Sequence, residues 1–181
     1  MIRIPSWLML TIPGALTVLS GAAISAQDKY TVQVPGGLAL AECRGYENWA
    51  AVAVSQAEGK INVIVANPVM IEAYLAGFPG NGKPFPDGAK TVKIHWKPEK
   101  STEAPAPVTI PGTLIGLGCM VKDGKRFPGT GGWGWAQFDY DAASGTFTPN
   151  TSFQGNDAKC GFACHTVVKV KDYVFTAYPK R

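Results

Sequence analysis

Two cysteines and a histidine near the end of the chain form the cluster best suited to chemistry. Cys160 and Cys164 are separated by three residues, and His165 follows the second cysteine directly. On a helical turn, side chains three or four residues apart lie on one face, so both thiols can reach the two vinyl groups of one porphyrin. The spacing is one residue wider than in the usual attachment motif of c-type haem. The cluster therefore predicts a covalently bound haem c with His165 as an iron ligand.

The cysteines also allow other interpretations. In an exported protein, four cysteines can form two disulfides with three possible pairings. Attachment of the haem through Cys164 alone is a further alternative. A Cys-x-x-Cys exchange pair does not fit the spacing, and an oxidising compartment disfavours a zinc thiolate site.

Few residues are available as a second axial ligand of the iron. Only 16 residues follow His165, and none of them is Met or His. Upstream, beyond residue 26, the conventional candidates are Met70, Met120 and His95. We therefore predict five-coordinate iron. Its open face suits a small ligand or substrate better than electron transfer alone.

The first 26 residues have the features of a removable export signal. Arg3 provides a positive start, and the apolar stretch 7–24 is interrupted by a Pro-Gly pair and ends at small residues before a cleavage site near Ala26. A permanent anchor would need about 20 unbroken apolar residues. We therefore expect a periplasmic protein without a stable membrane anchor, with one haem domain at 27–181.

Composition narrows the class of protein further. The chain has 181 residues, of which 46% are hydrophobic and 17% are charged, and it contains 21 Gly and 14 Pro. This Gly and Pro content without a collagen-like repeat predicts many turns and short strands. The net charge of +4 is spread along the chain, so we expect no nucleic-acid partner.

The pattern of hydrophobic residues predicts a mainly β (α+β) fold. Side chains alternate between two faces in 61–66 and again from residue 89 to 96, which is typical of strands. Further strands are expected at 114–121 and 133–140, followed by a hairpin to 146–148. One short helix is expected at 70–75, and loops at 78–88 and 101–111. The sum is an antiparallel sheet with a few short helices and C-terminal c-type haem attachment.

Several short segments share a pattern with one known family. Lys-Asp-Tyr-Val-Phe-Thr follows the Cys-Cys-His cluster at 171–176. The other segments are Phe-Pro-Asp-Gly at 85–88, Met-Val-Lys-Asp at 120–123, Lys-Arg-Phe-Pro at 125–128 and Gly-Trp-Gly at 132–134. Together, from about residue 45 to the end, they resemble the cytochrome P-460 (P460) family and its close relatives, the cytochromes c′-beta.

The resemblance implies a mainly β homodimer with one covalent haem per chain and histidine as the only protein ligand of the iron. In the cytochromes P-460 proper it also implies hydroxylamine oxidation and a covalent bond between a lysine nitrogen and a porphyrin carbon. The matching lysine is Lys93, five residues beyond Gly88. Substitution of a ring carbon would perturb the conjugation of the macrocycle. The alternative is an ordinary exposed strand lysine, since Lys90 and Lys97 lie nearby.

Two residues are candidates for a proton acceptor on the open side of the iron. His95 shares the predicted strand face of Lys93, and an imidazole that titrates near neutrality can accept a proton released in hydroxylamine oxidation. Asp123 is the rival base. The alternatives are a half-exposed strand histidine and a turn-forming aspartate. Phe85 and Phe127 are candidates for an apolar cap over the iron, with core packing as the simpler explanation.

Cys43 and Cys119 are left once the haem has taken two cysteines. In an oxidising compartment they can form a disulfide that closes a loop of about 77 residues, a constraint that the chain-entropy model values at roughly 4 to 5 kcal/mol. Two free buried thiols are the alternative.

The sequence as a whole favours an exported monohaem enzyme that oxidises hydroxylamine and passes electrons to a soluble acceptor such as another cytochrome. A nitric-oxide-binding protein of the c′-beta kind, without turnover, is the first alternative. A plain electron-transfer cytochrome is the second. The expected partners are a small nitrogen-oxide ligand or substrate, the electron acceptor and a second copy of the chain.

Overall fold

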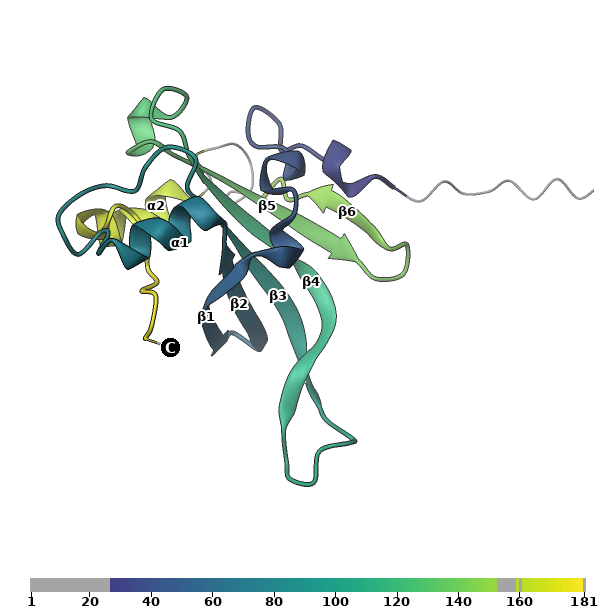
Figure 1. Cartoon of the computed structure of the whole chain (residues 1–181). Helices are drawn as coiled ribbons and strands as arrows, with labels where there is room; N and C mark the ends of the chain where they lie inside the picture. Colours follow the sequence, from purple (N-terminus) through teal and green to yellow (C-terminus); the bar gives the residue numbers. More distant parts are fainter. Residues whose placement is uncertain (1–26, 153–158, 160, 181) are drawn as a thin grey trace, which may run out of the picture.

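A six-stranded antiparallel sheet forms the centre of the computed structural model, which describes residues 27–152, 159 and 161–180. The strands follow one another in chain order, and each pairs with the next (Figure 1). They are β1 (Ala50–Ala57), β2 (Lys60–Ala66), β3 (Lys90–Lys100), β4 (Thr109–Lys122), β5 (Trp133–Asp141) and β6 (Thr146–Pro149). The predicted antiparallel, mainly β fold is confirmed. The expected signal at 1–26 lies outside the described residues.

The helices are short, as predicted. Helix α1 (Pro68–Leu75) begins where the Asn67 side chain accepts a hydrogen bond from the Met70 N–H, which satisfies one of the free amides at a helix start. The expected helix at 70–75 is thus confirmed and begins two residues earlier. Helix α2 (Phe162–His165) is a single turn followed by a 3-10 helix, Thr166–Lys171. Within the described ranges, no helix has the length and apolar character needed to cross a membrane.

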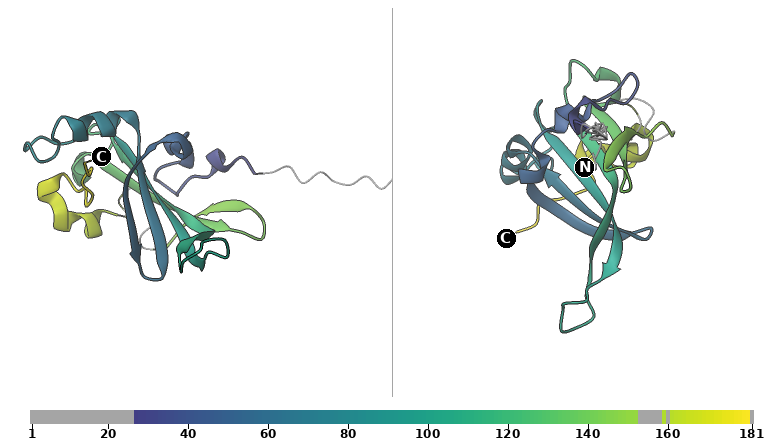
Figure 2. Two further views of the ribbon diagram at one scale, coloured as in Figure 1. Left: turned by 60° about the horizontal axis from the view of Figure 1, so that its bottom comes forward. Right: turned by 90° about the vertical axis from the view of Figure 1, so that its right-hand side faces the viewer.

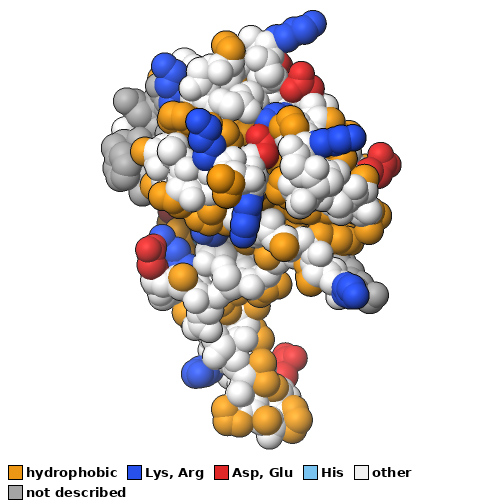
Figure 3. All heavy atoms as spheres, turned by 90° about the vertical axis from the view of Figure 1, so that its left-hand side faces the viewer, with side chains coloured by type: hydrophobic (Ala, Val, Ile, Leu, Met, Phe, Trp, Pro, Cys, Tyr) orange, Lys and Arg blue, Asp and Glu red, His pale blue; other side chains and the backbone are white. Residues whose placement is uncertain are grey.

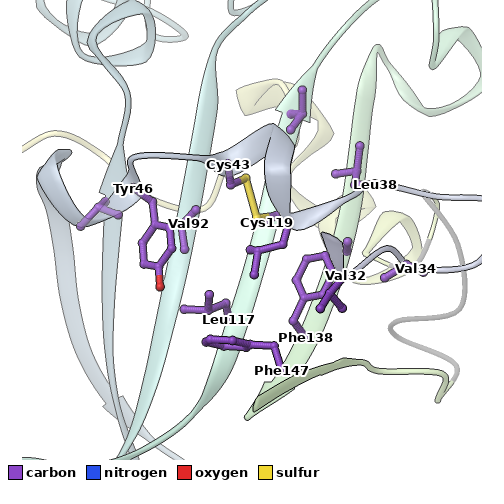
Figure 4. Close-up of a cluster of buried hydrophobic side chains, with 14 residues drawn as sticks. Val32, Val34, Leu38, Cys43, Tyr46, Val92, Leu117, Cys119, Phe138 and Phe147 are labelled. Atoms are coloured by element: carbon purple, nitrogen blue, oxygen red, sulfur yellow. A yellow bond between two sulfur atoms is a disulfide. The ribbon is translucent and has the colours of Figure 1, made fainter. Parts of the chain in front are cut away.

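One face of the sheet packs against the N-terminal segment. Val34 and Leu38 from this segment are fully buried together with Leu117 and Phe138 from the strands (Figure 4). A disulfide between Cys43 and Cys119 joins the segment to β4 in the middle of this core. The two cysteines are therefore paired, and the alternative of two free thiols is wrong.

The opposite face packs against α1 and the C-terminal segment, which lie on one side of the sheet in Figure 1 and in the left view of Figure 2. Met70 of α1 is fully buried there, with Phe85, Trp133 and Tyr173 around it. Two of the segments that resemble the known family, 85–88 and 171–176, thus meet on this face. The rest of the functional site is built beside them.

The loop expected at 101–111 is shorter than predicted. Strand β3 continues through Pro98 to Lys100, and β4 begins at Thr109, so that Pro98 pairs with Pro111. Beyond Trp96, β3 has no β2 partner, and prolines are tolerated in such a two-stranded ribbon because alternate N–H groups face solvent. The ribbon projects from the body of the protein, and hydrophobic side chains gather at its tip (Figures 1 and 3).

Candidate haem site

A cavity of about 570 Å³ lies on the sheet face that also carries α2. Its volume is in the range of cofactor sites, roughly 300 to 1,000 Å³. The strands β1 to β5 form one wall, and residues 161–165 and 174–176 form the other. Four predicted site residues line it: Lys93, His95, Cys164 and His165. Another predicted site residue, Cys160, lies outside the described residues.

Strand alternation brings Lys93 and His95 into this cavity, as the sequence predicts. In the register of the sheet, Lys93 pairs with Gly118 of β4 and His95 pairs with Gly116. A Cβ atom placed on Gly118 would lie 3.9 Å from His95 Nε2 and 3.9 Å from Lys93 Cβ. The absence of side chains on this part of β4 therefore leaves open space above the sheet, next to both residues.

His165 lies at one end of the cavity with its ring oriented by the backbone. Its Nδ1 atom is 2.6 Å from the carbonyl oxygen of Tyr173. A carbonyl can only accept, so Nδ1 carries the proton and the lone pair of Nε2 is free. Metal-binding histidines are held in this way, since a hydrogen bond at one nitrogen orients the other and increases its basicity. Burial lowers the pKa of His165, which also favours the neutral, ligating form.

The aromatic ring of Trp135 packs beside His165, at a centroid distance of 5.5 Å. Trp135 pairs across the sheet with Met120, and Met120 pairs with Thr91. Lys93 and His95 follow Thr91 at alternate positions, and each such step along a strand covers about 7 Å. The cavity thus has a His165 end and a His95 end, with Lys93 between them.

The position of Lys93 has an electrostatic consequence. Its ammonium group lowers the pKa of His95 and also that of His165, in each case as a smaller effect than burial. The charge of Lys93 acts on both imidazole rings, which agrees with the position of Lys93 between His95 and His165. The Lys93 side chain is exposed within the cavity, so its nitrogen is accessible to a bound group.

His95 is held in a neutral form at the far end. Its Nδ1 atom is 2.7 Å from Oδ1 of Asn62, a buried residue directly opposite on β2. The amide oxygen accepts the Nδ1 proton, so the lone pair of Nε2 is free. Burial, followed by the charges of Lys93 and Lys60, lowers the pKa of His95 to about 4. The ring is therefore uncharged at neutral pH and can accept a proton or bind a metal.

Cys164 is an exposed free thiol on the cavity wall, one residue before His165. Gly161 lies three residues before it, where the usual Cys-x-x-Cys-His motif would have its first cysteine. A Cβ atom at Gly161 would overlap the ring of Trp135. The indole therefore takes the space that a side chain at 161 would need, which gives a steric reason for a cysteine at the preceding position.

Three other predicted residues lie away from the cavity. Asp123 accepts hydrogen bonds from the N–H groups of Lys125 and Arg126, which favours its turn-forming interpretation. Phe85 is buried against Tyr74, at 5.1 Å between ring centroids. Phe127 packs against the other core and lines a second cavity, of about 420 Å³, whose described walls hold no histidine or cysteine. Core packing therefore accounts for both rings, and neither covers the His95 end.

The three conventional candidates for a sixth iron ligand lie in different places. Met70 lies on the buried face of α1, is fully buried and does not line the cavity. Met120 lines it in the same row as Trp135, which is the His165 end. Of the three candidates, His95 alone lies at the opposite end.

Sequence reasoning missed several polar residues of the cavity. Gln137 of β5 pairs with Gly118 and shares the face of Lys93. Ser55, Glu58 and Lys60 come from the β1–β2 hairpin. The alternation of side chains along β5 could have indicated that Gln137 faces the cavity. The hairpin residues have no such local pattern, because they reach the cavity only through the pairing of β1, β2 and β3.

The residues present fit a haem. His165 would hold its iron through the free Nε2, and the side-chain-free surface at Gly118 leaves room for the group in the cavity. Within the described part of the chain, the buried Nε1 of Trp135 has no hydrogen-bond partner, and an acceptor on a bound group would satisfy it. Cys164 and Lys93 are both accessible for covalent bonds.

Comparison with known proteins agrees with this geometry. The sequence model of the cytochrome P460 family, described as cytochrome P460, matches residues 43–176. The match extends from the disulfide cysteine to the end of the cavity wall, and so covers the whole described site. No curated protein matches the sequence. The family match confirms the resemblance inferred from the motifs and indicates a haem cofactor, and the chain therefore belongs to the cytochrome P460 family of haem cytochromes.

Proposed function

We propose that this protein is an exported monohaem c-type cytochrome that oxidises hydroxylamine and passes the electrons to a soluble acceptor such as another cytochrome. The observation that supports this most is the arrangement of one cavity, with His165 and His95 at opposite ends and Lys93 between them. Ligation by one histidine would leave the opposite side for a small substrate.

Each residue has a proposed role. Cys160 and Cys164 form the thioether bonds, His165 ligates the iron and Lys93 forms the cross-link to the macrocycle. When bound, the haem supplies the iron centre that holds the substrate nitrogen and takes up its electrons. The chain orients this group through the Tyr173 carbonyl, which fixes the ring of His165.

His95 is the proposed proton acceptor, through Nε2. Asn62 holds the Nδ1 proton in place, so that an incoming proton can go only to the cavity side of the ring. The ammonium of Lys93 lowers the pKa of His95. A Lys93 nitrogen that is bonded to a ring carbon no longer carries this charge, which would make His95 a stronger base.

The low pKa of His95 supports a second candidate function. A base with a pKa of about 4 takes protons weakly at neutral pH. Binding of nitric oxide without turnover, as in the cytochromes c′-beta, needs no proton acceptor. This function would follow if Lys93 stays uncrosslinked and keeps its charge.

The two candidates are separated by comparing the holoprotein with Lys93→Leu and with the control Lys97→Leu, an exposed lysine of the same strand that does not line the cavity. With a cross-link, the ferrous absorption band lies far to the red in the wild type and in the control, and returns to an ordinary c-type position in Lys93→Leu. Intact mass measures haem attachment in all three.

Turnover is measured as hydroxylamine consumption with an artificial oxidant. Consumption by the wild type above that of free haem supports the enzyme, and consumption no faster than free haem refutes it. A low-spin, six-coordinate ferric spectrum would instead reveal a second strong-field ligand, which is the electron-transfer alternative, and loss of that spectrum in His95→Gln would identify the ligand as His95. The proposed homodimer and the cleavage near Ala26 are tested by the solution mass and the N-terminal sequence of exported protein.

A further inference from the structure

A buried ion pair lies behind the cavity, outside its lining. Lys122 Nζ at the end of β4 is 2.9 Å from both carboxylate oxygens of Asp172. Only 6% of the Lys122 side chain and 10% of the Asp172 side chain are exposed. Two such charges are costly to remove from water, and they are tolerated only when paired and hydrogen-bonded.

The pair is hydrogen-bonded on both sides. The Phe85 N–H donates to Asp172 Oδ2 at 2.7 Å, and Lys122 donates to the Gly131 carbonyl at 2.8 Å. The carboxylate is thereby attached to two segments that are distant in sequence from residue 172. Phe85 itself is fully buried in the core that contains Met70, Trp133 and Tyr173.

The backbone at this point has an uncommon conformation. Asp172 has a φ of 50° and Tyr173 a φ of 64°. Non-glycine residues seldom adopt this left-handed region, and a large aromatic residue does so only when its surroundings hold it there. The ring of Tyr173 is accommodated because Gly131 has no side chain, since a Cβ atom there would overlap it.

This strained turn presents the carbonyl that orients the haem ligand. The Tyr173 carbonyl points at His165 Nδ1, at 2.6 Å. Two consecutive left-handed residues therefore aim one acceptor at the imidazole, and the ion pair holds the first of them. A continuous chain of contacts runs from Lys122 through Asp172 and Tyr173 to His165.

We propose that Lys122 and Asp172 are positioning residues for the haem ligand, which act by holding the Tyr173 carbonyl on His165 Nδ1. The inference rests on ligation by His165 and is independent of the substrate. A hydrogen bond at Nδ1 makes the imidazole a stronger donor to iron and stabilises the ferric state. Loss of the ion pair would weaken that bond and favour the ferrous state.

The test uses holoprotein variants and two readouts that do not require turnover. The variants are Asp172→Ala and Asp172→Asn. Asn keeps an acceptor for the Phe85 N–H and tolerates the left-handed conformation. The control is Asp141→Asn, which neutralises an exposed carboxylate whose hydrogen bonds, from the Ala143 N–H and the Ser144 hydroxyl, stay within the turn after β5. The readouts are the ferric/ferrous midpoint potential and the ferrous iron–histidine stretching frequency by resonance Raman spectroscopy.

Asp172→Ala should reduce the preference for the ferric state about tenfold, which is about 59 mV for one electron, and lower the stretching frequency. Asp172→Asn should shift both readouts in the same direction by less, and Asp141→Asn should shift neither. Unchanged potential and frequency in Asp172→Ala would overturn the proposal. Should that variant not fold, unchanged values in both Asp172→Asn and Lys122→Gln would do so.

The haem-free full chain provides an independent measurement, because it contains only two histidines. With ¹⁵N-labelled histidine, the wild-type His165 ring should show one tautomer, protonated at Nδ1. In Asp172→Ala it should show a mixture, while the signal of His95 stays the same. A single His165 tautomer in both proteins would refute the positioning role whether or not hydroxylamine is the substrate.

Discussion

His95 should make the stability of the protein depend on pH, and His95→Gln should remove that dependence. Burial, then the charges of Lys93 and Lys60, lowers the pKa of the folded ring to about 4 from an ordinary 6.5. Between these values the unfolded chain binds a proton that the folded chain does not. The free energy of unfolding therefore falls as the pH falls from 6.5 towards 4.

The size of the effect follows from the two pKa values. Between pH 7 and pH 4.5 they correspond to a loss of at most about 2.4 kcal/mol in the free energy of unfolding. Because the ring is only half-buried, solvent screening lowers the expected loss to about 1 to 2 kcal/mol.

The assay is urea unfolding of the haem-free full chain at pH 7, 5.5 and 4.5. Wild type and His95→Gln are compared, since carboxylates and His165 titrate in both proteins and cancel in the difference. The stability advantage of the wild type over the variant should shrink by about 1 to 2 kcal/mol from pH 7 to pH 4.5. A difference that is constant across this range would refute the assignment of His95 as a neutral cavity residue.

Three further outcomes are expected. Cys119→Ser should lower the free energy of unfolding by roughly 4 to 5 kcal/mol in non-reducing urea titrations, because the loop closed with Cys43 is lost; an equal loss on reduction of the wild type is the control. Gly161→Ala should cost about 1 to 3 kcal/mol through overlap with Trp135 and lower the haem content measured by absorbance; unchanged stability would show that the indole can move. Asn67→Ala should cost about 1 kcal/mol by loss of the cap of α1, measured by thermal unfolding, and no loss would contradict the capping role.

Much of the sheet was predictable because strands have a local signature. The alternation of 61–66 and 89–96 reports which side chains share a face, and this placed Lys93 and His95 together before any contact was known. A short helix at 70–75 was also expected, and the structure adds its cap at Asn67 and begins the helix at Pro68, two residues before the predicted start. The choice of His165 as the proposed ligand rests on residue type and spacing alone, since a histidine next to a cysteine needs no tertiary contact to be adjacent to it.

Other features depended on contacts between segments that are far apart in the chain. The disulfide partners are 76 residues apart, and composition allowed them to be either paired or free. Asp123 and Phe127 have the right chemistry for the site, but the folded chain uses one in a turn and the other in the opposite core. The loop predicted at 101–111 ends earlier, at the start of β4 at Thr109, because a strand that pairs on one side only can contain proline.

The ion pair of Lys122 and Asp172 illustrates the difference most clearly. Both residues belong to motifs that the sequence showed, yet neither motif indicates that they meet, because 50 residues separate them. The order of residues determines periodicity, capping and neighbouring ligands, since these arise within a few positions. Which carbonyl orients His165, and which charges hold that carbonyl, is settled only when the sheet brings distant segments into contact and excludes water between them.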